Sequence, residues 1–250
     1  MSRAFLFGSL LLCCLSCRAE RTLVTVGIEE LAYYPHYDFT QGQKRGFIFD
    51  FLSLFEQHSS YQFVYVPMPI KRLKYQFFDK QEIDVLYPFN PKWSEPIGAQ
   101  AELIFSPPIV GILGGTMVLS QNLGKGLEAF RHLAVPRGFT PIEWYKLRDK
   151  KQIRIVEVAD SLDALKMVIK QRVDGADIEY NVAKHLMRRH KLKAALSLDP
   201  QLPFSAVSFH LVTIKQSKLM AELNAFMEQH QSAIKKLKRQ FKLKESLVDI

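Results

Sequence analysis

One order of structural elements occurs twice in this chain, and this repetition limits the available folds more than any other feature. Each copy reads as a short apolar strand, a helix, a strand, a helix and a third strand with polar residues at its end. Two such α/β units create a cleft between them, and small ligands bind in clefts of this kind. The first copy spans LVTVGI (23–28), GFIFDFLSLFEQH (46–58), YQFVYVP (61–67), IKRLKYQFF (70–78) and IDVLY (83–87); the second spans HLAVP (132–136), PIEWYKLRD (141–149), IRIVEV (153–158), LDALKMVIKQ (162–171) and VDGADIE (173–179).

The size of the chain agrees with two lobes, and its charge shows no binding face. Its 250 residues, 48% of them hydrophobic, suffice for two lobes with their own cores. The formal charge of +9 is not organised as a binding face, so we expect no nucleic-acid partner. The cations are densest in the last helix, where they are expected to be solvated or to touch anionic lipid headgroups: Lys235, Lys236, Lys238, Arg239, Lys242 and Lys244.

The first 19 residues have the pattern of a secretory signal peptide. A short basic start is followed by an apolar run from Ala4 to Ser16, with cleavage expected after Ala19. We therefore expect a periplasmic protein. The alternative is a lipoprotein acylated at Cys17, one of three cysteines that all lie in this segment.

The chain has no flexible linker, so the lobes are expected to be joined by two short crossings that form a hinge. The crossings are expected at Phe105–Val118 and Gln201–Val212, the second containing the strand SAVSFHLVTI. Two helices, 217–229 and 231–241, follow. This order predicts a monomer with a signal peptide at 1–19, a discontinuous lobe 1 at 20–110 and 207–250, and lobe 2 at 111–206.

The order of elements and the local sequence motifs of the chain resemble those of the family 3 extracellular solute-binding proteins. The resemblance covers nearly the whole chain after the signal peptide. It implies an α/β, two-lobed type 2 periplasmic binding protein-like fold, in which each lobe is a mixed sheet flanked by helices and two hinge crossings join the lobes. It rests on the order and spacing of TVGIEELAYYPHYDF, RGFIFDFL, KQEIDVLYPF, IFSPPIV, QRVDGADIEYNVAKHL and LPFSAVSFHLVTIKQSKLMAELNAFM.

Lobe 1 offers aromatic and cationic candidates for the ligand site. Tyr33 and Tyr34 follow the first strand, where the family lines its site and where an aromatic ring can stack on a ligand. Alternatively, they belong to a surface loop. Arg72 opens a helix where its charge has the wrong sign for the dipole, so it is a candidate for binding a carboxylate. Alternatively, it pairs with Asp79 or Glu82, or is solvated.

A departure from the family follows the third strand. In amino-acid-binding members this region supplies polar groups and then an arginine that clamps the ligand carboxylate. Here the candidates are Asn90, Lys92 and Trp93, and the stretch FNPKWSEPIGAQAELIFS contains no arginine. Lys92 or Arg72 could supply the cation instead.

Lobe 2 offers a helix start and a carboxylate. Thr140 is expected to be an N-cap before Pro141, leaving backbone N–H groups free for an anion, with Arg137 beside them. The alternative is an ordinary cap. Glu179 stands where the family often has an aspartate that receives the ligand ammonium, or else it is a carboxylate that stabilises a helix start. We expect Asp177 to be a turn or surface group.

These residues predict a periplasmic solute-binding protein that closes over a small polar solute, amino-acid-like or an organic anion, for an ABC transporter permease or a sensor. The alternatives are a sensory or interaction module on the same fold and an enzyme, dehydratase-like, with Glu179 as general base. The chain lacks the HExxH, GxSxG, P-loop and dinucleotide motifs. We therefore expect no enzyme activity, no metal and no cofactor.

Overall fold

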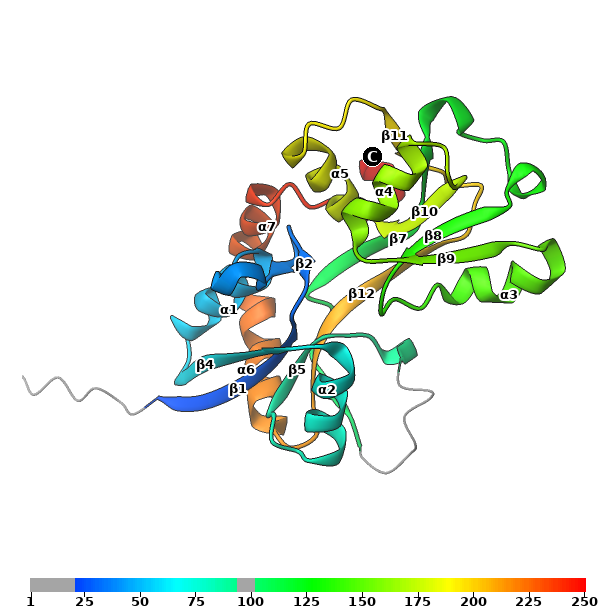
Figure 1. Cartoon of the computed structure of the whole chain (residues 1–250). Helices are drawn as coiled ribbons and strands as arrows, with labels where there is room; N and C mark the ends of the chain where they lie inside the picture. The colour runs from blue at the N-terminus through cyan, green and yellow to red at the C-terminus, as the bar shows by residue number, and fades with distance from the viewer. Residues whose placement is uncertain (1–20, 94–101) are drawn as a thin grey trace, which may run out of the picture.

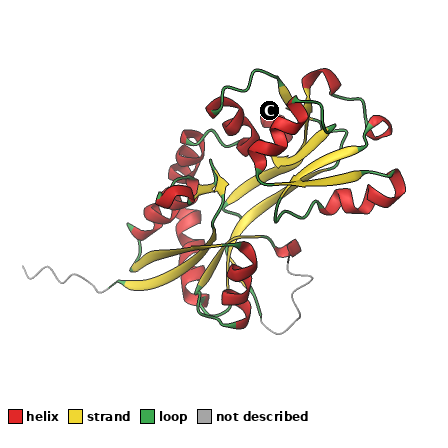
Figure 2. Cartoon of the chain, in the orientation of Figure 1, coloured by secondary structure: helices red, strands yellow, loops and turns green. Residues whose placement is uncertain are grey.

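One ten-stranded sheet runs through the molecule, with helices on its faces (Figures 1 and 2). The computed structural model describes residues 21–93 and 102–250. The predicted signal peptide lies outside the described residues. The main strand order is β4-β1-β5-β12-β7-β10-β8-β9, with β6 beside β12 and β11 beside β7. A mixed sheet with two lobes therefore confirms the predicted fold class.

The repeat that is visible in the sequence is also present in the arrangement of the strands. In each copy the first strand lies in the middle, pairs in parallel with the second on its outer side, and has the third on its inner side. The first copy consists of β1 (Thr22–Glu29), α1 (Phe47–Glu56), β4 (Tyr61–Met68), α2 (Ile70–Lys74) and β5 (Val85–Phe89); the second consists of β8 (His132–Pro136), α3 (Ile142–Lys151), β9 (Arg154–Val158), α4 (Ser161–Ile169) and β10 (Gly175–Glu179).

Each of the two predicted crossings contains a long strand, and the strand predicted in the second crossing is present as β12. β7 (Val110–Leu119) and β12 (Phe204–Thr213) pair with each other antiparallel, β7 also pairs with β10, and β12 also pairs with β5. Gly111, Gly114 and Gly115 of the first crossing lie inside β7. The lobe boundaries at 110/111 and 206/207 stay a prediction, and both fall within these shared strands.

The remaining elements complete the two lobes. α6 (Ser217–Gln229) and α7 (Gln231–Gln240) confirm the predicted closing helices, and the predicted helix 70–78 consists of α2 and a π-helical turn, Tyr75–Asp79. The other elements are β2 (Ala32–Tyr33), β3 (Tyr37–Asp38), β6 (Ile104–Phe105), α5 (Tyr180–Arg189), β11 (Leu196–Leu198) and short 3₁₀ turns at Thr40–Gly42, Pro91–Trp93, Ser120–Asn122, Leu127–Ala129 and Leu247–Asp249.

The core of lobe 1 depends on residues from both ends of the chain. Phe51 and Phe55 lie four residues apart on α1 and are buried, as expected for one face of a helix. Both contact Phe226 of α6, with ring centroids 6.2 and 5.2 Å away. Gly46 caps α1 with φ +124°, and a Cβ there would lie 2.7 Å from the Cα of Tyr37, so only glycine fits.

The end of the chain returns to lobe 2. Asn181, a buried residue of α5, donates to the Lys244 carbonyl at 2.9 Å and accepts from the Lys244 N–H at 2.8 Å. Glu245 accepts from the Gly111 N–H at 2.6 Å and from Lys238 at 2.8 Å. The segment 241–250 therefore contacts α5 and β7, and its assignment to lobe 1 stays a prediction.

No helix in the described part of the chain is both long and apolar enough to cross a membrane.

The close packing of β7 generates a first prediction. A Cβ at Gly115 would lie 2.5 Å from Leu198 Cδ1 and 3.1 Å from Phe204 Cβ, whereas at Gly114 the nearest atom is Ser205 Oγ at 3.0 Å. We expect Gly115→Ala to lower the free energy of unfolding by about 1–3 kcal/mol because two packed residues must move. Gly114→Ala, one residue away on the same strand, should cost less in urea unfolding. Equal losses would show that the packing of Leu198 is not the cause.

Candidate functional site

Acidic side chains from both lobes surround a buried tyrosine where the strands of the two lobes meet. Tyr33 is 5% exposed. Burial raises the pKa of its phenol well above the usual value, and the negative charges of Glu179, Glu29 and Asp177 raise it further. We call Tyr33 and these three acids the Tyr33 cluster. Glu29 ends β1 in lobe 1, while Asp177 and Glu179 lie on one face of β10 in lobe 2.

Glu29 is held by lobe 1. It accepts a hydrogen bond of 2.8 Å from the hydroxyl of Tyr37. Burial raises the pKa of Glu29, and this effect outweighs the hydrogen bond and the charge of Lys74, which lower it. The Tyr87 hydroxyl is also buried beside Tyr37, and it has no hydrogen-bond partner among the described residues. The lobe 1 wall of the cluster is therefore acidic and phenolic.

Glu179 is buried and already has partners. Its Oε1 accepts from Asn181 Nδ2 at 2.7 Å, and its Oε2 accepts from the Val182 N–H at 2.8 Å, which caps α5. His36 of lobe 1 lies opposite, with Nε2 3.1 Å from Oε2, but the angle does not suit a hydrogen bond. The sequence offered Glu179 either as a helix-start carboxylate or as a ligand group. The cap is present, and the ligand role stays a prediction.

Asp177 differs from the other acids because it has no hydrogen bond or ion pair within the described part of the chain. It lies two residues before Glu179 and pairs in the sheet with Thr116. Its side chain is half-buried, and burial raises the pKa of its carboxyl to about 7. The expectation of a turn or surface group was wrong, since Asp177 lies inside β10. The two-residue period that links it to Glu179 could have identified it.

Aromatic residues close the space between the lobes. Tyr33 stacks on Phe139 of lobe 2, with ring centroids 5.7 Å apart, and Tyr34 contacts His185 of α5 at 4.4 Å. Burial, together with Arg188, Arg189 and Arg45, lowers the pKa of His185 to about 4, so this ring is neutral at physiological pH. Both predicted tyrosines are thus placed at the junction of the lobes.

The residues predicted after the third strand mainly support the backbone. Asn90 is buried, donates to the Ser208 carbonyl at 2.7 Å and accepts from the Lys92 N–H at 2.9 Å. Trp93 packs on Phe89 and Phe209, whereas Lys92 is exposed. Residues 94–101 of this stretch lie outside the described residues. A ligand contact by Asn90, Lys92 or Trp93 stays a prediction.

The predicted cationic and capping residues lie at the surface. Arg72 is exposed and forms no ion pair with a described residue, so the suggested pairing with Asp79 or Glu82 is absent. The Arg137 side chain is 74% exposed and donates to Glu157 at 3.1 Å. Thr140 is exposed, and the prediction that it caps the helix was wrong by one residue: α3 begins at Ile142 with Pro141 as its N-cap.

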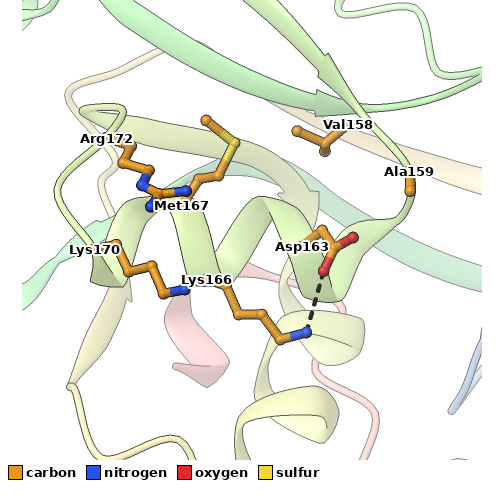
Figure 3. Close-up of a pocket in the computed structure, with 7 residues that line it drawn as sticks. All are labelled: Val158, Ala159, Asp163, Lys166, Met167, Lys170 and Arg172. Atoms are coloured by element: carbon orange, nitrogen blue, oxygen red, sulfur yellow. Dashed lines mark hydrogen bonds and ion pairs between the residues drawn. The ribbon is translucent and has the colours of Figure 1, made fainter.

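A shallow depression of about 300 Å³ lies on lobe 2 beside α4, and no acid of the Tyr33 cluster lines it (Figure 3). Its rim carries the ion pair between Lys166 and Asp163 at 3.1 Å. Among the described residues there is no cluster of three or more histidine, cysteine or acidic side chains suited to a metal ion. The lining residues are Val158, Ala159, Asp163, Lys166, Met167, Lys170 and Arg172.

Solved structures show which fold this is. An ancestral arginine-binding protein bound to arginine matches 90% of this chain and 100% of its own, with TM-score 0.70 and 17% identity. A histidine kinase sensor domain with similarity to periplasmic binding proteins matches 90% of this chain and 98% of its own, with TM-score 0.70 and 15% identity. An arginine transport-system periplasmic binding protein from Legionella pneumophila matches 87% of this chain and 98% of its own, with TM-score 0.66 and 14% identity.

The chain therefore has the type 2 periplasmic binding protein fold. No model of a known family matches the sequence, and no curated protein is similar to it. The likeness is one of structure, and the resemblance noted in the sequence agrees with it.

Glu179 and Asp160 give a matched pair of caps. Both carboxylates accept from a backbone N–H at a helix start, but Glu179 is buried and also holds Asn181, while Asp160 is exposed. We expect Glu179→Ala to lower the free energy of unfolding by roughly 2–4 kcal/mol, because it removes a cap and takes away one of the partners of the buried Asn181 amide, which keeps its hydrogen bonds to Lys244. Asp160→Ala should cost about 1 kcal/mol. Equal losses in urea unfolding would contradict the supporting role of Glu179.

Asp177 should make stability depend on pH. Its pKa is about 7 in the folded protein and about 3.9 in an unfolded chain. Between these values the folded state holds a proton that the unfolded state releases, so stability falls as pH rises. We expect the free energy of unfolding of the unsubstituted protein to fall by up to about 4 kcal/mol between pH 4 and 8 because of Asp177. Asp177→Asn should remove this fall, as measured by urea unfolding.

The matched control is Asp163→Asn, the same chemical change in an exposed pair of lobe 2. It should leave the pH profile unchanged because exposed ion pairs contribute little. An Asp177→Asn profile parallel to that of the unsubstituted protein would show that Asp177 is not the group responsible.

Proposed function

We propose that this protein binds a small solute carrying an ammonium or guanidinium group, with that cation held in the Tyr33 cluster. The observation that carries the proposal is Asp177. This carboxylate is kept in a poorly solvated position without a partner among the described residues, and a positive ligand group would stabilise its charged form. Of the two solute classes that the sequence offered, this favours the amino-acid-like one over an organic anion.

The charge of the whole junction supports the same choice. Glu29, Asp177 and Glu179 surround Tyr33, while the predicted cations Arg72, Lys92 and Arg137 are exposed. In a poorly solvated site three carboxylates would repel an anion and attract a cation. Tyr33 would stack against the solute, as the sequence predicted.

The role that we propose is binding rather than catalysis. Glu179, the general base that the sequence offered, has both oxygens engaged by lobe 2, so it is poorly placed to take a proton from a substrate. We further propose that the protein acts in the periplasm with a transporter permease or a sensor. A solute that binds the closed lobes more tightly shifts their population, and a partner can recognise that shift.

The test is a thermal-shift screen of the purified protein against cationic amino acids, polyamines, neutral amino acids and organic acids, followed by calorimetric titration of any solute that stabilises it. A solute at about 100 times its dissociation constant should add about 2.7 kcal/mol of stability. We expect Asp177→Asn to weaken binding by about 2 kcal/mol or more, roughly thirtyfold.

Asp163→Asn again serves as the control and should bind like the unsubstituted protein. Tighter binding of organic acids than of cationic solutes would contradict the proposed charge of the ligand. Equal affinities of Asp177→Asn and Asp163→Asn for the same solute would remove Asp177 from the site.

A further inference from the structure

Two histidines that are far apart in the sequence lie together at the ends of α1 and α6. His58 follows α1 and His230 follows α6, and their ring centroids are 4.3 Å apart with an angle of 59° between the rings. Phe226, a buried residue of α6, stacks on His230 at 4.5 Å and fixes that ring.

The hydrogen bonds of the two rings determine which nitrogen is free. His58 Nδ1 lies 2.9 Å from the Leu54 carbonyl oxygen, and His230 Nδ1 lies 3.0 Å from that of Phe226. A carbonyl oxygen can only accept, so each Nδ1 must carry the hydrogen. In each neutral ring the lone pair is then on Nε2. Metal-binding histidines are commonly oriented in this way, with the other ring nitrogen donating to a backbone carbonyl.

The two rings lie at different kinds of helix end. His58 follows the carboxyl end of α1, where carbonyl groups create a negative potential, whereas His230 lies between the carboxyl end of α6 and the amino end of α7. His58 is exposed and His230 is half-buried, so an ion can reach the pair from solvent. Two rings whose Nδ1 atoms face backbone carbonyl oxygens are therefore held side by side within reach of ions from solvent.

We propose that His58 and His230 bind a divalent transition-metal ion through their Nε2 atoms. Imidazole nitrogen suits Cu²⁺, Ni²⁺ and Zn²⁺, and the general order of affinities places Cu²⁺ first. Since the described residues contain no cluster of three or more such ligands, water completes the coordination of the ion. The site is independent of the Tyr33 cluster and of the proposed solute.

The experiment is a calorimetric titration of the purified protein, free of any histidine tag, with CuCl₂, NiCl₂ and ZnCl₂. We expect one ion per chain, bound most tightly as Cu²⁺. His58→Ala and His230→Ala should each weaken binding by about tenfold or more, because each removes one of two protein ligands. Electron paramagnetic resonance of the Cu²⁺ form should show coupling to two imidazole nitrogens, and to one in each variant.

His190→Ala is the control, since His190 is exposed at the end of α5 in lobe 2. It should leave the affinity unchanged. If an alanine variant does not fold, as judged by circular dichroism, His58→Gln and His230→Gln replace it. The proposal is overturned if the protein binds none of the three ions, or if binding survives unchanged in the folded variants of either histidine.

Discussion

The antiparallel pairing of β7 with β12 is the interaction on which the rest of the structure depends. β7 pairs with β10 of the second repeat, and β12 pairs with β5 of the first. Within the described part of the sheet, the two repeats are joined where β7 and β12 hydrogen-bond to each other. The third strand of each repeat is thereby brought to the same central region. Residues at the ends of β1 and β10 can then surround Tyr33, although they come from different lobes.

The Tyr33 cluster shows how this junction differs from an ordinary core. A core excludes unpaired charge, but here Asp177 remains beside a buried phenol, and the Tyr87 hydroxyl has no partner among the described residues. Such groups reduce stability unless something else satisfies them. The proposed solute would supply the missing partner, and sites that bind ligands commonly sacrifice stability in this way.

The sequence predicted those features that depend on local periodicity. The predicted strand 132–136 matches β8, and the predicted helix 217–229 matches α6. The strand β7 was missed because Gly111, Gly114 and Gly115 suggest a loop, whereas Gly115 leaves room for Leu198. Asp177 was misjudged, and His58 was not linked to His230, because burial and contacts between distant segments cannot be read from one sequence.

The insertion of one lobe inside the other has a consequence for the order of folding. The strands of lobe 2 that follow β7 are nearly contiguous in the sequence, but the lobe 1 sheet needs β12, and α1 packs against Phe226 of α6, close to the end of the chain. The amino-terminal half of lobe 1 must therefore wait, with its phenylalanine-rich helix uncovered, until β12 and α6 are in place. Uncovered apolar surface promotes aggregation, so lobe 1 is most exposed to this risk before α6 covers α1.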